Sequence, residues 1–237
     1  MYNHGVEINI HDLRQVVVFR NASDEDLAQI AQNALPRSIE DGSYFFLQGD
    51  PAHYLYVLTS GSVKLLQNNP AGQQVNLRTI NPWQMFGALG AVRQPASYPA
   101  SAQALEDSTA LAMESSFLRS MMETRPYLSF DLMHLMTAYI QEMQERYREL
   151  ATERVEQRIA RALLRLTSQL GRRLDPEKDI ELSFSRQDLA EMTGTTLYTV
   201  SRTLSEWERR GLLKTGRERV TIRQPHSLVQ IAEGLDE

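Results

Sequence analysis

The sequence predicts an α+β fold made of an N-terminal antiparallel β-roll, a long central helix and a C-terminal winged helix-turn-helix. Short β-type runs separated by turn residues fill the stretch from Pro36 to about Glu114. Helical periodicity then takes over from Pro126, and a strand, two short helices and a hairpin are expected within 180–223. A chain of 237 residues is long enough for two domains with a core each.

The β-roll is predicted from runs at 43–48, 53–66, 73–80, 100–105 and 108–113, with turn residues between them. Many short strands at this spacing favour a small antiparallel barrel or roll. A short helix over 23–34, which Ser23 can cap, is expected before the roll. A second one is expected after it, from Phe117 to Glu123.

The long helix is predicted to begin at Pro126, because proline is favoured at the first position of a helix. Its apolar residues recur at spacings of four and three, a single stripe at coiled-coil pitch. The stripe is too long for one small roll to cover, so we expect a seam between two copies of the chain, although packing within one domain is the alternative. The predicted seam consists of Leu132, Met136, Tyr139, Met143 and Leu150, with Arg146 in the same stripe.

The stripe is interrupted at Thr152 to Val155, and a new apolar set follows at Ile159, Ala162, Leu163 and Leu166. We therefore expect a helical hinge at 150–155. The expected domains are a sensory β-roll domain at 1–125, a dimerisation helix at 126–152 and a winged helix-turn-helix domain at 153–237.

The helix-turn-helix is predicted from capping and turn residues within 180–223. Ser185 and Asp188 have the spacing of a capping box, and Gly194 suits the tight turn between two helices. Thr195 or Thr196 can cap the second helix, which is expected to bury Val200, Leu204 and Trp207 and to end at Gly211. Two strands around 216–218 would form the wing.

The exposed face of the second helix has the chemistry of a DNA-reading surface. Hydroxyl groups contact phosphates or base edges, and arginine can pair with guanine through two hydrogen bonds. Residues 196–223 hold seven basic and three acidic residues, although the whole chain has a net charge of −5. A solvated polar face is the alternative. The candidate DNA contacts are Ser185, Thr196, Tyr198, Thr199, Ser201, Arg202, Arg217 and Arg219.

Several classes of protein are excluded by what the sequence lacks. Without cysteine the chain cannot form disulfides, iron–sulfur clusters or thiolate zinc sites. No apolar run approaches the roughly 18 residues of a transmembrane helix, and no signal-peptide core is present, so we expect a cytoplasmic protein without a membrane partner. No enzyme motif is present either, so we expect no catalytic residues, no metal site and no enzymatic activity.

The sequence resembles the Crp/Fnr superfamily of bacterial transcription regulators over nearly its whole length. The resemblance is carried by YLYVLTSGSVKL (54–65), RIARALLRL (158–166) and FSRQDLAEMTGTTLYTVSRTLSEWERRGLL (184–213). It implies a homodimer whose roll is similar to a cyclic-nucleotide-binding domain. It also implies control of promoters, as an activator, through a roughly palindromic site on double-stranded DNA and contact with RNA polymerase. The charged loop 172–178 falls in the polymerase-contacting region of that family, with a solvated loop as the alternative.

The departures from the family pattern narrow the range of possible effectors. Members that bind cAMP use a Gly-Glu-Leu element and an Arg-Ser pair, which are Gly87-Ala88-Leu89 and Tyr98-Pro99 in this chain. Met143 and Gln144 stand where those members place small hydroxyls for adenine. The strong charge-assisted bonds to a nucleotide are therefore lost, which argues against cAMP. The absence of cysteine excludes the iron–sulfur Fnr branch. On the recognition helix, Tyr198 replaces the glutamate that accepts a hydrogen bond from cytosine.

The string GTTLYTVSR (194–202) looks most like the Nnr/Dnr branch that regulates nitrogen-oxide respiration, which implies nitric oxide sensing through haem. Candidate haem ligands are His4, His11, His53, His134 and the methionines near the stripe, although a lone histidine is more often a surface or packing residue. An apolar effector pocket for haem or another apolar molecule is predicted, or the same side chains fill the space themselves. Its expected lining is Phe86, Leu89, Tyr98, Met136, Tyr139 and Met143. The alternative function is a regulatory protein with this fold that does not recognise a DNA sequence.

Overall fold

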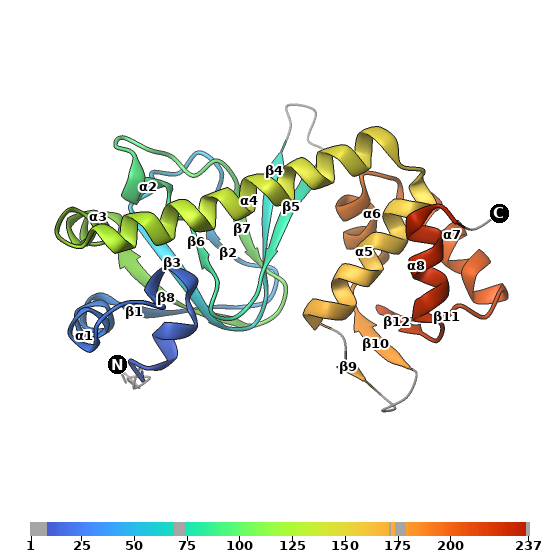
Figure 1. Ribbon diagram of the computed structural model, residues 1–237, viewed down its shortest axis with the longest axis horizontal. Helices are drawn as coiled ribbons and strands as arrows, with labels where there is room; N and C mark the ends of the chain where they lie inside the picture. The colour runs from blue at the N-terminus through green and yellow to red at the C-terminus, as the bar shows by residue number, and fades with distance from the viewer. Residues whose placement is uncertain (1–8, 69–73, 171, 174–178, 236–237) are drawn as a thin grey trace. The chain divides into compact units, whose positions relative to one another are not determined.

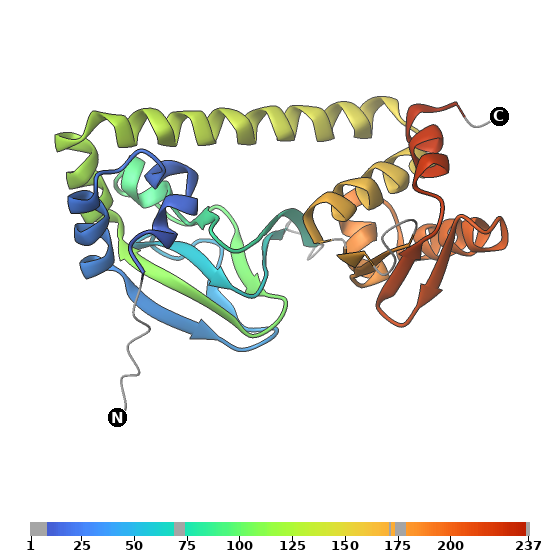
Figure 2. The ribbon, with the colours of Figure 1, turned by 60° about the horizontal axis from the view of Figure 1, so that its bottom comes forward.

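The computed structural model describes residues 9–68, 74–170, 172–173 and 179–235. The chain divides into two compact units, Met1–Gln141 and Glu142–Glu237, and each is described by itself. The division falls within helix α4 (Pro126–Thr152), which is continuous across it (Figure 2). No helix in the described part of the chain is long and apolar enough to cross a membrane.

The first unit contains two four-stranded antiparallel sheets, which together form the predicted β-roll (Figure 1). One sheet has the order β1-β8-β3-β6 and the other β2-β7-β4-β5. All five predicted β-type runs form strands, and β1 and β6 are additional. The strands are β1 (Leu35–Ile39), β2 (Tyr44–Phe46), β3 (Tyr54–Ser60), β4 (Val63–Asn68), β5 (Gln74–Ile80), β6 (Met85–Phe86), β7 (Ser101–Ala104) and β8 (Ser108–Glu114).

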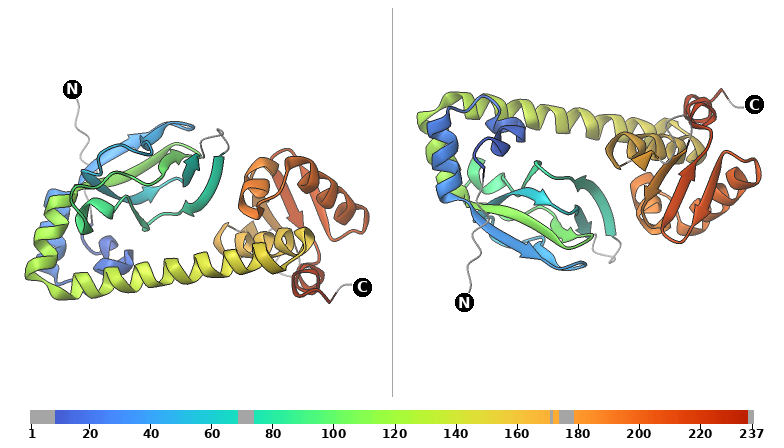
Figure 3. Two further views of the ribbon diagram at one scale, coloured as in Figure 1. Left: turned by 90° about the horizontal axis from the view of Figure 1, so that it is seen from above. Right: turned by 90° about the horizontal axis from the view of Figure 1, so that it is seen from below.

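Helices cover one end of the roll. They are the 3₁₀ turns η1 (Asp12–Gln15) and η2 (Val17–Phe19), α1 (Asp24–Asn33), α2 (Leu89–Val92), α3 (Ser115–Thr124) and the first turns of α4. Ser23 caps α1 as predicted, by accepting a hydrogen bond from the backbone N–H of Asp26. Helices α1 and α3 lie side by side at this end (Figure 3).

A buried polar cluster joins α1 to the junction of α3 and α4. Asp26 forms an ion pair with Arg125, and its second carboxylate oxygen accepts a hydrogen bond from the Tyr127 hydroxyl at 2.7 Å. Burial favours the protonated form of Asp26. The hydrogen bonds from Tyr127, Arg125 and Ser23 outweigh that effect and hold the pKa of Asp26 below its usual value.

The second unit is the predicted winged helix-turn-helix. It contains α5 (Val155–Leu170), β9 (Arg172–Arg173), β10 (Ile180–Ser183), α6 (Arg186–Thr193), α7 (Leu197–Arg209), β11 (Leu213–Gly216), β12 (Arg219–Ile222) and α8 (Pro225–Glu233). The strands form one antiparallel sheet in the order β11-β12-β10-β9. Ile159, Ala162 and Leu163 of α5 are completely buried in its core.

The last turns of α4 belong to the second unit and form ion pairs with α5. Helix α4 ends at Thr152 and α5 begins at Val155, so residues 153–154 are not helical and the expectation of a helical hinge is wrong. The Arg165 guanidinium of α5 lies 2.6 Å from the buried Glu149 carboxylate, and Arg161 lies 3.0 Å from Glu153. We call these two pairs the α4–α5 clasp. The Glu149–Arg165 pair spans the predicted hinge segment and both pairs lie within the second unit, so residues 150–155 are internal to that unit.

Candidate nucleic-acid interface

The two helices of the helix-turn-helix are fixed by caps at both N-termini. The Ser185 hydroxyl accepts a hydrogen bond from the backbone N–H of Asp188 at 3.0 Å, and the Asp188 carboxylate accepts one from the backbone N–H of Ser185 at 3.2 Å. This is the predicted capping box. The Ser185 hydroxyl is therefore engaged in the cap.

The turn between α6 and α7 depends on Gly194. Its φ of +60° lies in the left-handed region, which glycine adopts without a steric penalty. A Cβ at this position would lie 2.7 Å from the Leu150 methyl group of α4, so the last turn of α4 packs directly on this turn. Thr196 then caps α7 by accepting a hydrogen bond from the backbone N–H of Thr199 at 3.2 Å.

Helix α7 buries one face and exposes the other. Val200 and Leu204 are completely buried and Trp207 is nearly so, as predicted. The opposite face carries Tyr198, Arg202 and Ser205, which are exposed, and Ser201, which is half-buried. Arg202 forms no ion pair with any described residue, so its guanidinium is available for a ligand.

The wing is the hairpin of β11 and β12. The Glu208 carboxylate of α7 accepts hydrogen bonds from the backbone N–H and the hydroxyl of Thr215, both at 2.7 Å, and these bonds lower the pKa of Glu208. They tie the wing to the recognition helix. Arg217 is exposed at the tip, whereas Arg219 lies 3.5 Å from Glu181 and so shares its charge with a carboxylate.

The interior of the roll is filled by aromatic side chains. Tyr98 stacks on Phe46 with ring centroids 3.7 Å apart, and its hydroxyl donates a hydrogen bond to the Tyr54 carbonyl at 2.6 Å. Phe86 is buried in the same cluster, against Phe46 and Tyr56. Burial raises the pKa of Tyr98, which therefore stays neutral. The position of the nucleotide-binding arginine is thus occupied by a phenol ring that belongs to the core.

The predicted effector pocket is not formed by its six predicted residues, which is a correction. Phe86 and Tyr98 pack among the roll's own rings, and the Tyr139 ring lies 3.8 Å beneath the Arg78 guanidinium. Leu89 is half-buried, and Met143 is largely exposed in the second unit. Of the six, only Met136 lines the cavity described next.

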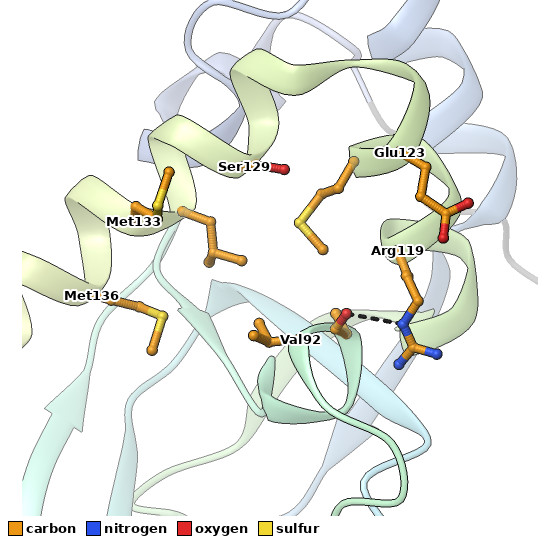
Figure 4. A pocket seen from close by; sticks show the side chains of 9 residues that line it. Val92, Arg119, Glu123, Ser129, Met133 and Met136 are labelled. Atoms are coloured by element: carbon orange, nitrogen blue, oxygen red, sulfur yellow. Dashed lines mark hydrogen bonds between the residues drawn. The ribbon is translucent and has the colours of Figure 1, made fainter.

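A cavity of about 330 Å³ lies between α2, α3 and α4 (Figure 4). Its walls are mainly apolar, with Val92 of α2 facing Met133 and Met136 of α4, and Met122 of α3 also lining it. At the rim, Arg119 donates a hydrogen bond to the Ala91 carbonyl at 3.2 Å, which fixes α2. Sequence reasoning did not find this cavity, because α2 is a single turn without a periodic pattern.

The described residues do not fit haem. His11, His53 and His134 are all exposed, and none of them lines the cavity beside Met136. His4 lies outside the described residues. The cavity volume is near the lower end of the range for drug-sized ligands, and haem is larger. Nor do the described residues include a group of three or more acidic or histidine side chains that could hold a metal ion.

The exposed apolar stripe of α4 differs from the predicted stripe by one residue at alternate positions. Leu132 is 6% exposed and belongs to the core of the first unit, which corrects its predicted place in a seam between copies. Tyr139 is half-buried under Arg78, and Arg146 is paired with Glu142 at 2.9 Å. The large apolar side chains that remain exposed follow spacings of three and four and include Met136, Met143 and Leu150 from the prediction. Phe130 is exposed as well, and we call those from Met133 onward the α4 stripe: Met133, Met136, Ile140, Met143, Tyr147 and Leu150.

The β-roll and the winged helix-turn-helix together define a class of DNA-binding proteins. Two domain families match the chain, the cyclic nucleotide-binding domain at residues 36–125 and the Crp-like helix-turn-helix domain at 157–231. The Cyclic AMP receptor protein of Thermus thermophilus is 30% identical over 199 residues, which cover 84% of this chain and 88% of that protein. The Transcriptional activator protein anr of Pseudomonas aeruginosa is 28% identical over 198 residues, 84% of this chain and 80% of the relative.

Solved structures agree with this assignment. A CRP-family transcriptional regulator from Thermus thermophilus has a TM-score of 0.70 and 26% identity, and the match covers 83% of this chain and 96% of that one. FixK2 from Bradyrhizobium japonicum shares the fold, with a TM-score of 0.72 at 22% identity over 84% of this chain and 96% of that one. The protein belongs to the Crp/Fnr family. It is a DNA-binding transcription regulator of that family and not an enzyme.

Proposed function

We propose that the protein acts as a homodimer that binds a roughly palindromic DNA site through α7 and responds to an effector other than a cyclic nucleotide. The observation that carries the DNA contact is Arg202, which is exposed and has no ion-pair partner among the described residues. It lies on a recognition helix that is capped and packed on its opposite face. A helix of this kind enters the major groove with its N-terminal residues toward the bases. Tyr198, Thr199 and Ser201 precede Arg202 on the same helix, and Thr196 caps it.

Dimerisation is supported by the α4 stripe. Its six exposed apolar side chains recur at alternating spacings of three and four residues, the seven-residue pattern of a two-stranded coiled coil. If two copies of α4 pair along this stripe, its side chains are removed from water in both copies. Two recognition helices related by a twofold axis then fit successive major grooves of one site.

The effector is proposed to be a small apolar molecule in the cavity beside Met136. Met133 and Met136 belong both to the cavity wall and to the α4 stripe. A molecule bound in the cavity would therefore contact the helix that pairs in the proposed dimer. A cyclic nucleotide is disfavoured, because Tyr98 fills the place of its arginine partner and Ala88 replaces the glutamate. Nitric oxide sensed through haem is not part of the proposal, since the described residues provide no fitting site. Contact with RNA polymerase through 172–178 stays a prediction, because 174–178 lie outside the described residues.

Substitution of Arg202 tests the DNA contact. The Arg202→Ala protein should lose about 1–3 kcal/mol of binding free energy and should lose discrimination at one base pair of each half-site. Arg209→Ala is the matched control, because Arg209 lies on the same helix, is exposed and carries the same charge. The assay is a gel shift on a duplex selected by the wild-type protein from a random pool. Equal losses in the two variants would mean that Arg202 contributes only its charge, and the assignment of base contacts would be wrong.

The effector site is tested by reducing the cavity. Met122→Phe places a rigid ring in the cavity wall and should change the affinity for DNA by shifting the position of α4. The dye 1-anilinonaphthalene-8-sulfonate is a probe for binding in the cavity, and its fluorescence should fall in this variant. If neither DNA affinity nor dye fluorescence changes, the cavity is not the effector site.

A further inference from the structure

The N-terminal end of α7 carries two large side chains that the fold of the second unit leaves exposed. Leu197 is 47% exposed and Tyr198 is 76% exposed, although both lie in the first turn of a helix with a well-buried opposite face. Tyr198 precedes Arg202 by four residues, so the two side chains are neighbours on the helix surface. An apolar pair at the end of a helix that enters a groove is placed next to the bases.

The hydrogen-bonding groups beside this pair are used within the helix cap. The Thr196 hydroxyl accepts a hydrogen bond from the backbone N–H of Thr199 and lies 2.9 Å from the Thr199 hydroxyl. No Asn, Gln, Asp or Glu occurs in 195–202. Adenine is recognised by Asn or Gln and cytosine by Asp or Glu, so this end of α7 lacks the usual partner of either base. Arg202 provides the partner of guanine.

Thymine is the remaining base, and its C5-methyl group is the apolar feature of the major groove. We propose that Leu197 and Tyr198 determine DNA specificity by apolar contact with thymine methyl groups, next to the guanine that Arg202 contacts. This inference rests on the proposed DNA contact through α7. The phenol ring, and not its hydroxyl, makes the contact.

The experiment removes the methyl group alone. A duplex is selected from a random pool by the full-length protein, and each thymine is then replaced in turn by 2′-deoxyuridine. Loss of one contacted methyl should weaken binding about fourfold, and loss of the equivalent methyl in both half-sites about fifteenfold. Tyr198→Ala and Leu197→Ala should each remove this dependence at one position, whereas Tyr198→Phe should keep it.

The outcomes separate this inference from the proposed function. If the wild-type protein binds every deoxyuridine duplex equally while Arg202→Ala still loses specificity, methyl recognition is refuted and the DNA contact through α7 stands. Loss of methyl dependence in Tyr198→Phe would also refute it, because the hydroxyl would then be the reading group. If the protein selects no sequence from the pool, the proposed function fails and this inference fails with it.

Discussion

Ile140 distinguishes the α4 stripe from the stripe predicted by sequence alone. Its side chain is 54% exposed in the structure, and full burial of an isoleucine contributes about 1.5–3 kcal/mol. Pairing of two α4 helices along the stripe would bury the remaining half, or about 1 kcal/mol in each copy. The Ile140→Ala substitution should therefore weaken the dimer by about 2 kcal/mol, which is about a thirtyfold increase in its dissociation constant.

The assay is sedimentation equilibrium over a dilution series, with Thr137→Ala as the control because Thr137 is exposed on the same helix but outside the stripe. Leu132→Ala should behave differently, since Leu132 is buried in its own unit: the free energy of unfolding should fall by about 2–5 kcal/mol. The reasoning is refuted if Tyr139→Ala weakens the dimer more than tenfold while Ile140→Ala leaves it unchanged.

Three further predictions concern stability, each measured by chemical denaturation. Asp26→Asn should lower the free energy of unfolding by about 1.5–3 kcal/mol at neutral pH. Because the folded-state pKa of Asp26 is lowered, this difference should be complete above the ordinary pKa of about 4. It should shrink as the pH falls from there through the lower folded-state pKa. Gly90→Ala should lower the free energy of unfolding by about 1–3 kcal/mol, because the new Cβ would lie 1.8 Å from the Ala52 carbonyl oxygen. Gly216→Ala is the control, because a Cβ at that position makes only ordinary contacts. Equal losses in the two variants would contradict the packing argument. Glu149→Gln should cost about 3 kcal/mol by removing the carboxylate that faces Arg165, and an unchanged unfolding midpoint would mean that the clasp is not stabilising.

Local chemistry made much of the fold predictable. Ser23, Ser185 and Thr196 each cap the helix that the sequence indicated, and Gly194 forms the expected left-handed turn. These features depend on side chains within a few residues of one another, so no tertiary information is needed. Strand β1 was hidden because it contains Pro36, and β6 is only two residues long.

The phase of the α4 stripe could not be predicted, because two stripes fit the same sequence. Both contain Met136, Met143 and Leu150, and they differ in whether Leu132 and Tyr139 or Met133 and Ile140 complete them. The choice depends on which flank of α4 is covered by the core and by Arg78, which are distant in sequence.

The prediction of the effector pocket was wrong for a similar reason. Aromatic residues such as Phe86 and Tyr98 can line a space or fill it, and only their mutual packing decides.

The α4–α5 clasp has a consequence for protein engineering. A chimaera that joins the sensory part of one family member to the DNA-binding part of another would ordinarily have its junction at a helix end, here Thr152. In this protein such a cut would separate Glu149 from Arg165 and Leu150 from the turn at Gly194. The transferable DNA-binding module begins instead near Glu142, inside α4, so a working graft should carry about three helical turns of α4 with it.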